Sequence, residues 1–375
     1  MSAPLFRLTD AQPTTELLAA RQQHLRTELE KRRLPILVVS SPVNIFYLTG
    51  FHGTAGVALF DRFEAVLWVD PRYTLQARDQ ASGVEVIEAR TGLFKAVGRR
   101  LTKRRARLAG YEDAHLSCAQ FKNLERESPR TTRWQAAGGI VEELRMVKDS
   151  YETDRIRQAG HLTAEVLTEI IPGVRPGVRE SDLAVELEYR MRRKGADGAA
   201  FETIVASGVR GALPHARASS KQLSARELVI FDLGAILAGY AADMTRTLYL
   251  GKPGLRVRNL HKAVVEAERE AVEAARHGAR AGDVDGAARR SLKRRGLADH
   301  FTHSTGHGVG LEVHERPRLG RNEKTRLRAG FVVTAEPGIY LEGFGGVRVE
   351  DTVLVGTEGS PEILTPAPKE PWFIE

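Results

Sequence analysis

Short apolar runs alternate with helical stretches in the N-terminal part of the chain. The apolar runs are rich in valine, isoleucine and leucine and have the length of β-strands, and Asp61-Arg62 predicts a turn between two of them. We expect strands at 34–39, 57–60, 65–69 and 84–87, with a helix near 74–78. This alternation predicts an α/β layer.

The C-terminal part contains longer segments with the hydrophobic periodicity of helices, and these segments end at a glycine or before Pro172-Gly173. Helices are expected at 150–171, 181–194, 257–277 and 283–295. Asp149 and Glu152 can cap the first of them reciprocally. Because 375 residues exceed what one ordinary core supports, the pattern predicts two domains, residues 1–142 and 143–375. The last residues, 366–375, carry no recognisable signal.

Two aspartates that lie eleven residues apart, Asp232 and Asp243, flank a predicted turn. If the two strands pair as a hairpin about Leu237 and Ala238, these aspartates become direct cross-strand partners. Partners of this kind have Cβ atoms about 4.5–5.5 Å apart, and like charges so placed are destabilising. We therefore expect a cation between them.

A second carboxylate pair, Glu336 and Glu350, lies symmetrically about the loop 341–345. Between the two hairpins lies His307, whose flanking glycines allow backbone and ring to approach a crowded centre. Four carboxylates and one imidazole would neutralise two divalent cations, and such a pair can lower the pKa of a shared water toward about 7. Any one of these motifs occurs by chance in turns, whereas five in this order predict a hydrolytic metal site.

The ordered set of five ligands and its flanking sequences resembles the metallopeptidase family of prolidase, aminopeptidase P and methionine aminopeptidase. The resemblance implies a pita-bread catalytic domain with a curved antiparallel sheet, and an α/β (α+β) class for the whole chain. Residues 42–51 resemble the opening of the creatinase-like N-terminal domain of prolidases and aminopeptidases P. By resemblance, Asp232 binds one metal, His307 and Glu336 hold the other, and Asp243 and Glu350 bridge both.

Four further residues match positions of the active site. His215 matches the family's histidine that contacts substrate and transition state, and His303, His314 and Arg348 match pocket residues of the proline-specific branch. The resemblance implies that His215 stabilises the oxyanion, that Glu336 shuttles the proton, and that the other three shape a pocket for the proline ring. For each of the three histidines, an ordinary hydrogen-bonding role is the alternative interpretation.

Strand alternation after Asp243 separates the next two polar residues. Thr245 lies on the face of Asp243 and is expected to support the metal ligands. Arg246 faces the other way and is expected to pair with a surface acid.

The function predicted in this way is that of a dinuclear Xaa-Pro aminopeptidase of the aminopeptidase P type. The short glycine-rich loop 343–346 leaves little chain for a lid, so the substrate groove is expected to be open to longer peptides. A strict Xaa-Pro dipeptidase is the alternative, and a non-catalytic member that binds peptide or nucleic acid is the alternative from another class. Retention of all five ligands favours an enzyme. Ligand hardness favours Mn²⁺, with Zn²⁺ or Co²⁺ as alternatives.

The net charge of +8 raises the question of nucleic acid. The arginine clusters lack interleaved aromatic residues and adjoin helical patterns, which favours solvated helix faces and no nucleic-acid partner. No window has the apolar length of a membrane span, and the N-terminus lacks the apolar core of a signal peptide. We expect a cytoplasmic homodimer that does not bind membranes and whose partner is a peptide with proline at its second position.

Overall fold

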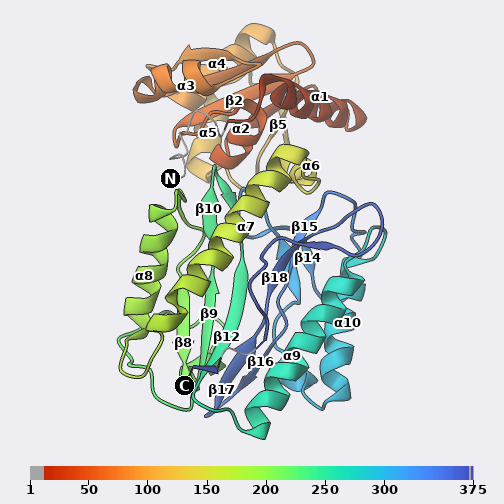
Figure 1. Cartoon of the computed structure of the whole chain (residues 1–375). Helices are drawn as coiled ribbons and strands as arrows, with labels where there is room; N and C mark the ends of the chain where they lie inside the picture. Colours follow the sequence, from red (N-terminus) through yellow and green to blue (C-terminus); the bar gives the residue numbers. More distant parts are fainter. Residues whose placement is uncertain (1–11, 371–372, 375) are drawn as a thin grey trace. The chain divides into compact units, whose positions relative to one another are not determined.

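The chain divides into two compact units in the computed structural model, which describes residues 12–370 and 373–374 (Figure 1). The first unit ends at Arg145 and the second begins at Met146. No helix in this described part is both long and apolar enough to cross a lipid bilayer.

The N-terminal unit is built on a mixed sheet. Its strands are β1 (Ile36–Val39), β2 (Gly56–Asp61), β3 (Ala65–Val69), β4 (Glu85–Glu88), β5 (Leu108–Tyr111) and β6 (Arg133–Ala136). They are ordered β4-β3-β2-β1-β5-β6, and only β2 runs antiparallel to its neighbours. All four strands predicted from the apolar runs are present.

Helices complete this unit. They are α1 (Thr15–Lys31), α2 (Pro42–Thr49), η2 (Pro71–Tyr73), α3 (Thr74–Gln80), α4 (Leu93–Arg104), α5 (Cys118–Glu127) and α6 (Ile140–Arg145). Val97 of α4 and Leu124 of α5 share a buried core with Val38, Leu59 and Val66 of the sheet. Burial of these apolar side chains is the main force that holds the layer together, and the predicted α/β layer is confirmed.

The C-terminal unit contains four long helices close to the predicted positions. The helical segments are α7 (Ser150–Ile170), η3 (Ile171–Gly173), α8 (Glu180–Arg193), η4 (Gly208–Ala212), α9 (Leu255–Ala274), α10 (Ala281–Arg294) and η5 (Ala298–His300). The α7 helix begins with the predicted capping box, in which the side chains of Asp149 and Glu152 each accept the other's backbone N–H.

Strands of the same unit form two larger sheets and two small ones. They are β7 (Gly198–Ala199), β8 (Ile204–Ser207), β9 (Leu228–Leu233), β10 (Ala235–Leu237), β11 (Tyr240–Ala241), β12 (Met244–Leu250), β13 (Gly306–Gly308), β14 (Glu315–Leu319), β15 (Val332–Ala335), β16 (Gly338–Leu341), β17 (Gly345–Arg348), β18 (Asp351–Leu354), β19 (Glu362–Ile363) and β20 (Phe373–Ile374). The strand orders are β20-β12-β9-β8, β14-β13-β15-β18-β19, β11-β10-β7 and β16-β17. Every pairing is antiparallel except that of β12 with β20.

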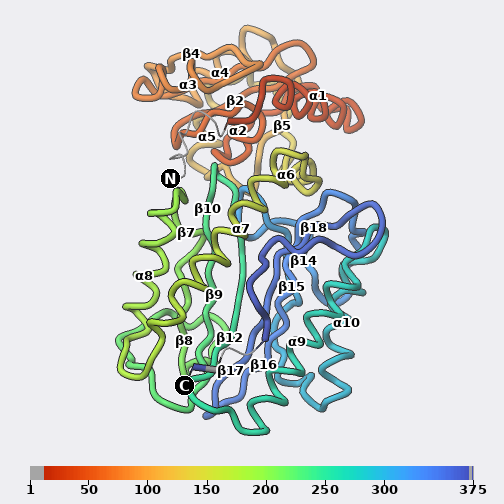
Figure 2. Tube along the Cα trace, viewed as in Figure 1, coloured from red at the N-terminus to blue at the C-terminus, as the bar shows by residue number. Residues whose placement is uncertain are grey.

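Each helix pair covers its own group of strands (Figures 1 and 2). Buried residues of α7 and α8 share a core with β8, β9 and β12, whereas those of α9 and α10 share a core with β15, β16, β17 and β18. The apolar faces of the helices are thus buried against one side of the strands. The polar residues at the strand ends are left available for a functional site.

The first predicted hairpin has a different register from the one expected. Thr245, not Asp243, is the Cα partner of Asp232, because the turn is formed by Ala238 and Gly239, with φ angles of 51° and 82°. Two successive positive φ angles are typical of a type I′ hairpin turn, which favours glycine at its second position. The prediction that Asp232 and Asp243 are direct cross-strand partners is therefore wrong.

The second hairpin has the predicted register. Gly338 pairs with Arg348, and Ala335 pairs with Asp351. Both ladders continue one register, in which Glu336 falls opposite Glu350. The interruption between the ladders releases both glutamates from strand pairing beside the site.

Candidate metal centre and active site

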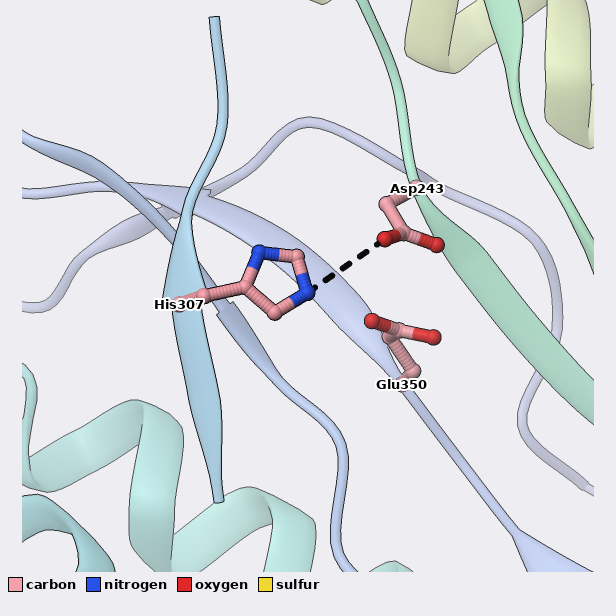
Figure 3. Close-up of side chains that lie close together, drawn as sticks. All are labelled: Asp243, His307 and Glu350. Atoms are coloured by element: carbon pink, nitrogen blue, oxygen red, sulfur yellow. Dashed lines mark ion pairs between the residues drawn. The ribbon is translucent and has the colours of Figure 1, made fainter. Parts of the chain in front are cut away.

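Three predicted ligands from separate strands converge in the C-terminal unit. Ligand atoms of Asp243, His307 and Glu350 all lie within 4.8 Å of one another. Figure 3 shows the three side chains directed toward one another. His307 Nε2 is 3.6 Å from Asp243 Oδ2 and 3.4 Å from Glu336 Oε1. Asp243 directly precedes β12, and Glu350 directly precedes β18, so the ends of two sheets bring the cluster together.

The His307 ring is held in the tautomer that a metal ligand needs. Its Nδ1 lies 3.0 Å from the main-chain oxygen of Gly308, which can only accept, so Nδ1 carries the proton and Nε2 presents its lone pair to the carboxylates. The backbone here is crowded. A Cβ at Gly306 would lie 2.1 Å from the Thr334 main-chain oxygen, and one at Gly308 would lie 2.3 Å from that of Arg316, so only glycine fits at either position.

Burial and mutual repulsion disfavour the ionised forms of the clustered carboxylates. Desolvation, and then the neighbouring carboxylates, raise the pKa of Asp243 and of Glu350 well above their usual values. Desolvation also raises the pKa of Glu336 to about 7. Among the residues that the structure describes, no hydrogen-bond donor reaches two buried oxygens, Asp232 Oδ1 and Glu350 Oε1. Unpartnered carboxylate oxygens around an imidazole lone pair are the donor set that a hard or borderline divalent cation prefers, so the residues fit a metal.

Asp232 stands somewhat apart from the other predicted ligands. Its Oδ2 forms a buried ion pair with Arg348, while Oδ1 is the unpartnered oxygen. Arg348 also donates to the Thr245 hydroxyl at 3.0 Å and to the Pro214 main-chain oxygen at 3.1 Å. Thr245 in turn donates to Glu350 Oε2 at 2.6 Å. Thr245 was predicted to support the metal ligands, and it contacts one candidate ligand, Glu350, directly.

A hydrogen-bonded chain joins Arg348 to His303. Arg348 Nη1 donates to the Tyr340 hydroxyl at 2.9 Å, and that hydroxyl lies 2.8 Å from His303 Nε2. His303 Nδ1 donates to the Ser304 main-chain oxygen, so Nε2 accepts a hydrogen bond from the Tyr340 hydroxyl. Desolvation lowers the pKa of His303 to about 4, which keeps the ring neutral. Sequence analysis missed Tyr340, although strand alternation after Glu336 places it on the same face.

A cavity of about 620 Å³ opens over this floor. It is lined by all nine predicted site residues and their neighbours: Phe201, Glu202, Ile204, Pro214, His215, Arg217, Asp232, Asp243, His303, Ser304, His307, His314, Glu315, Arg318, Glu336, Arg348 and Glu350. His215 and His314 are exposed at the wall, and the His314 ring meets the His307 ring edge-on with centroids 4.3 Å apart.

Arg318 is a lining residue that sequence analysis also missed. It is the Cα partner of His307 across β13 and β14, and its side chain is exposed. Within the part of the chain that the structure describes, no ion pair or hydrogen bond occupies its guanidinium. It also lines a second cavity of about 630 Å³, which shares His303 and Ser304 with the first. Nothing in its local sequence distinguishes this arginine from the many others.

Arg246 differs in part from its prediction. It faces away from the cavity, as expected, but its partner Asp351 is completely buried and not a surface acid. A buried charged pair is stable only when nearly all its polar atoms are hydrogen-bonded. All three guanidinium nitrogens of Arg246 donate hydrogen bonds, to Asp351 and to main-chain oxygens.

Comparison with known proteins agrees with this arrangement. Residues 154–357 match metallopeptidase family M24, and residues 21–147 match the creatinase/prolidase N-terminal domain. A Xaa-Pro dipeptidase of Pyrococcus furiosus is 35% identical over 351 residues, which cover 93% of this chain and 99% of the relative.

Solved structures of similar proteins extend the match to the fold. A Xaa-Pro dipeptidase from Bacillus anthracis superposes with a TM-score of 0.92 at 33% identity, covering 95% of this chain and all of that one. An X-Pro aminopeptidase from Thermotoga maritima superposes with a TM-score of 0.85 at 33% identity, covering 92% and 99%. The predicted resemblance and two-domain α/β fold class are confirmed.

Proposed function

The chain belongs to metallopeptidase family M24, and from this premise we propose that it is a metal-dependent exopeptidase that cleaves the bond between an N-terminal residue and a following proline. The observation that supports this most is the buried cluster of carboxylates around the Nε2 lone pair of His307, on the floor of a cavity. The Xaa-Pro dipeptidases and the X-Pro aminopeptidase that match nearly the whole chain supply the Xaa-Pro substrate class.

We assign five residues to the metals, as the sequence predicted: Asp232, Asp243, His307, Glu336 and Glu350. Two divalent cations held there would supply Lewis acidity and a water of lowered pKa. Mn²⁺ suits the oxygen-rich set, with Zn²⁺ or Co²⁺ as alternatives. Arg348 orients Asp232, and Thr245 orients Glu350, through the contacts described above.

Proton transfer and substrate orientation fall to other residues. Glu336 has a pKa raised to about 7 by burial, which suits a group that accepts and releases a proton near neutral pH. His215, exposed at the cavity wall, can donate to the substrate's carbonyl oxygen as negative charge develops there. Proline offers no amide hydrogen for a hydrogen bond, so its ring must be recognised by shape. We assign this recognition to His303 and His314, which line the cavity together with Phe201 and Pro214.

Substrate length is the finer question, and here we propose a preference for dipeptides. The predicted preference for longer peptides rested on the loop 343–346 being too short to form a lid over the groove. No residue of that loop is among those that line the cavity, so the length of the loop does not decide the preference. Phe344 instead lies under the Arg256 guanidinium, 4.2 Å from it. Arg318, whose guanidinium has no partner among the described residues, can bind the carboxylate that ends an Xaa-Pro dipeptide. Aminopeptidase P activity is the second candidate, because the cavity beyond Arg318 could hold residues that follow proline.

The deciding experiment measures kcat/KM on matched Xaa-Pro, Xaa-Pro-Xaa and Xaa-Ala-Xaa peptides, with each metal added back to stripped protein. A dipeptide preference above about tenfold, equal to about 1.4 kcal/mol of transition-state free energy, supports the dipeptidase. Equal or faster cleavage of the tripeptide supports the aminopeptidase. Absence of cleavage with every metal would refute both and favour a non-catalytic binding role.

A further inference from the structure

A second cluster of buried charges lies behind the candidate metal centre. It consists of Arg246, Glu268, Asp351 and Lys369, and we call it the rear network. The carboxylates of Glu268 and Asp351 are fully buried, and the Arg246 side chain is 3% exposed. Lys369 Nζ bridges the two acids, at 2.8 Å from Glu268 and 2.6 Å from Asp351, and Arg246 lies 2.7 Å from Asp351. Two basic and two acidic side chains therefore meet in one buried cluster.

The rear network contacts the main chain of one candidate ligand, Glu350, directly. Arg246 Nη1 donates to the main-chain oxygens of both Thr245 and Glu350, at 2.9 and 2.5 Å. The Glu350 backbone N–H donates to the same Thr245 oxygen. Beside these contacts, the Thr352 hydroxyl donates to the Asp243 main-chain oxygen at 2.8 Å. Of the two residues assigned to both metals, the main chain of Glu350 is thus held by Arg246, and that of Asp243 is held by Thr352, which directly follows Asp351 of the network.

The C-terminal segment completes the network. We call residues 365–369 the strap. Its main-chain oxygens at Thr365, Ala367 and Pro368 accept hydrogen bonds from Arg246. The Thr365 hydroxyl donates to Asp351 at 2.9 Å and accepts the backbone N–H of Thr352 at 3.1 Å. The end of the chain, which gave no signal in the sequence, is therefore attached to the two strand ends that bear Asp243 and Glu350.

We propose that Arg246 and Lys369 are positioning residues for Asp243 and Glu350, so that the strap sets the metal affinity of the centre from outside the cavity. This inference rests on the proposed metal-dependent function. Without Lys369, Glu268 and Asp351 lose a shared cation, and their repulsion acts on the residue next to Glu350. Without Arg246, the main-chain oxygens of Thr245 and Glu350 lose their common donor. Residues that support metal ligands in this way change metal affinity by about 10- to 100-fold.

The test compares Lys369→Met with Lys369→Arg, which keeps the charge. Lys194→Met is the matched control. Lys194 directly follows α8 and also bridges two glutamates, Glu165 and Glu169 of α7, at 2.8 Å each, but it contacts no candidate ligand. Mn²⁺ dissociation constants are measured by calorimetry on stripped protein, together with metal-free melting temperatures and kcat at limiting and saturating Mn²⁺.

We expect Lys369→Met to weaken Mn²⁺ binding by at least about tenfold, and to lower kcat at limiting Mn²⁺ more than at saturating Mn²⁺. Lys369→Arg should restore most of the affinity, and Lys194→Met should change it less than twofold. A lower melting temperature with unchanged Mn²⁺ affinity in Lys369→Met would overturn the inference, because the network would then be only a stabilising contact. If Lys369→Met does not fold, Thr365→Val decides by the same criteria. Failure of the unchanged protein to bind Mn²⁺ would instead refute the proposed function.

Discussion

Replacement of Arg318 by methionine tests how the cavity recognises the end of its substrate. The substitution removes the guanidinium and keeps an unbranched side chain, while the candidate metal ligands are untouched. Since no ion pair or hydrogen bond with another described residue occupies this guanidinium, its loss leaves no buried group without a partner. We therefore expect the fold and the metal content to persist, and the effect to be confined to substrates that end in a carboxylate after proline.

The magnitude follows from the setting of Arg318. A hydrogen bond to a charged group contributes about 1.5–3 kcal/mol. Arg318 is exposed at the cavity wall, and solvent weakens charge pairs in such positions. The lower end of the range, about 1.5 kcal/mol, corresponds to a loss of about tenfold in kcat/KM for the dipeptide.

The assay compares an Xaa-Pro dipeptide with its C-terminal amide, in the unchanged protein and in Arg318→Met. Amidation removes the carboxylate, so the two changes together form a double cycle whose coupling energy isolates the contact. Arg321→Met is the control, because Arg321 lines only the neighbouring cavity and leaves the catalytic one intact. An equal loss for acid and amide, or an equal loss in the control, would show that Arg318 does not bind the substrate's carboxylate.

Three further outcomes follow from the site. Asp243→Ala and Glu350→Ala should each remove both metals, and elemental analysis that finds two metals in either variant would contradict the bridging assignment. His215→Ala should keep its metals but lower kcat by about 10²–10³-fold, the range for one oxyanion donor; an unchanged kcat would return His215 to an ordinary hydrogen-bonding role. Burial raises the pKa of Glu336 from 4.5 to about 7, so the metal-free fold is favoured by a bound proton and loses stability as the pH rises toward 7. The gap in melting temperature between metal-loaded and stripped protein should therefore widen from about pH 5 to about pH 8, and a constant gap would refute this.

Local signals explain why much of the fold could be predicted from the sequence. The helix that begins at Ser150 is specified by Asp149, Glu152 and its own apolar period, and the hairpin of Glu336 and Glu350 is centred on its glycines. The register predicted for the first hairpin is wrong, because the register depends on the backbone conformation of two turn residues, Ala238 and Gly239. A shift of one residue in the turn displaces every cross-strand partner by two.

Contacts distant in sequence explain what could not be predicted. Tyr340 joins Arg348 to His303, and Arg318 faces the cavity only because β13 and β14 pair beside His307. The role of Arg246 depends on Asp351, more than one hundred residues away in the chain. Single residues of common types give no local sign of such partners, whereas five ligands in a fixed order form a pattern that sequence alone can show.

The charge balance of the candidate metal centre gives an independent reason to expect two cations there. Four carboxylates, those of Asp232, Asp243, Glu336 and Glu350, face a single guanidinium, that of Arg348. His307 contributes no charge, because its Nδ1 proton is engaged with Gly308 and desolvation lowers the pKa of the ring. If all four acids ionise, three negative charges remain uncompensated. One divalent cation cannot balance them, whereas two leave one positive charge in excess, which suits a site that must receive an anionic group. Without cations the same balance can be reached only by protonation, which is the direction in which the carboxyl pKa values are shifted.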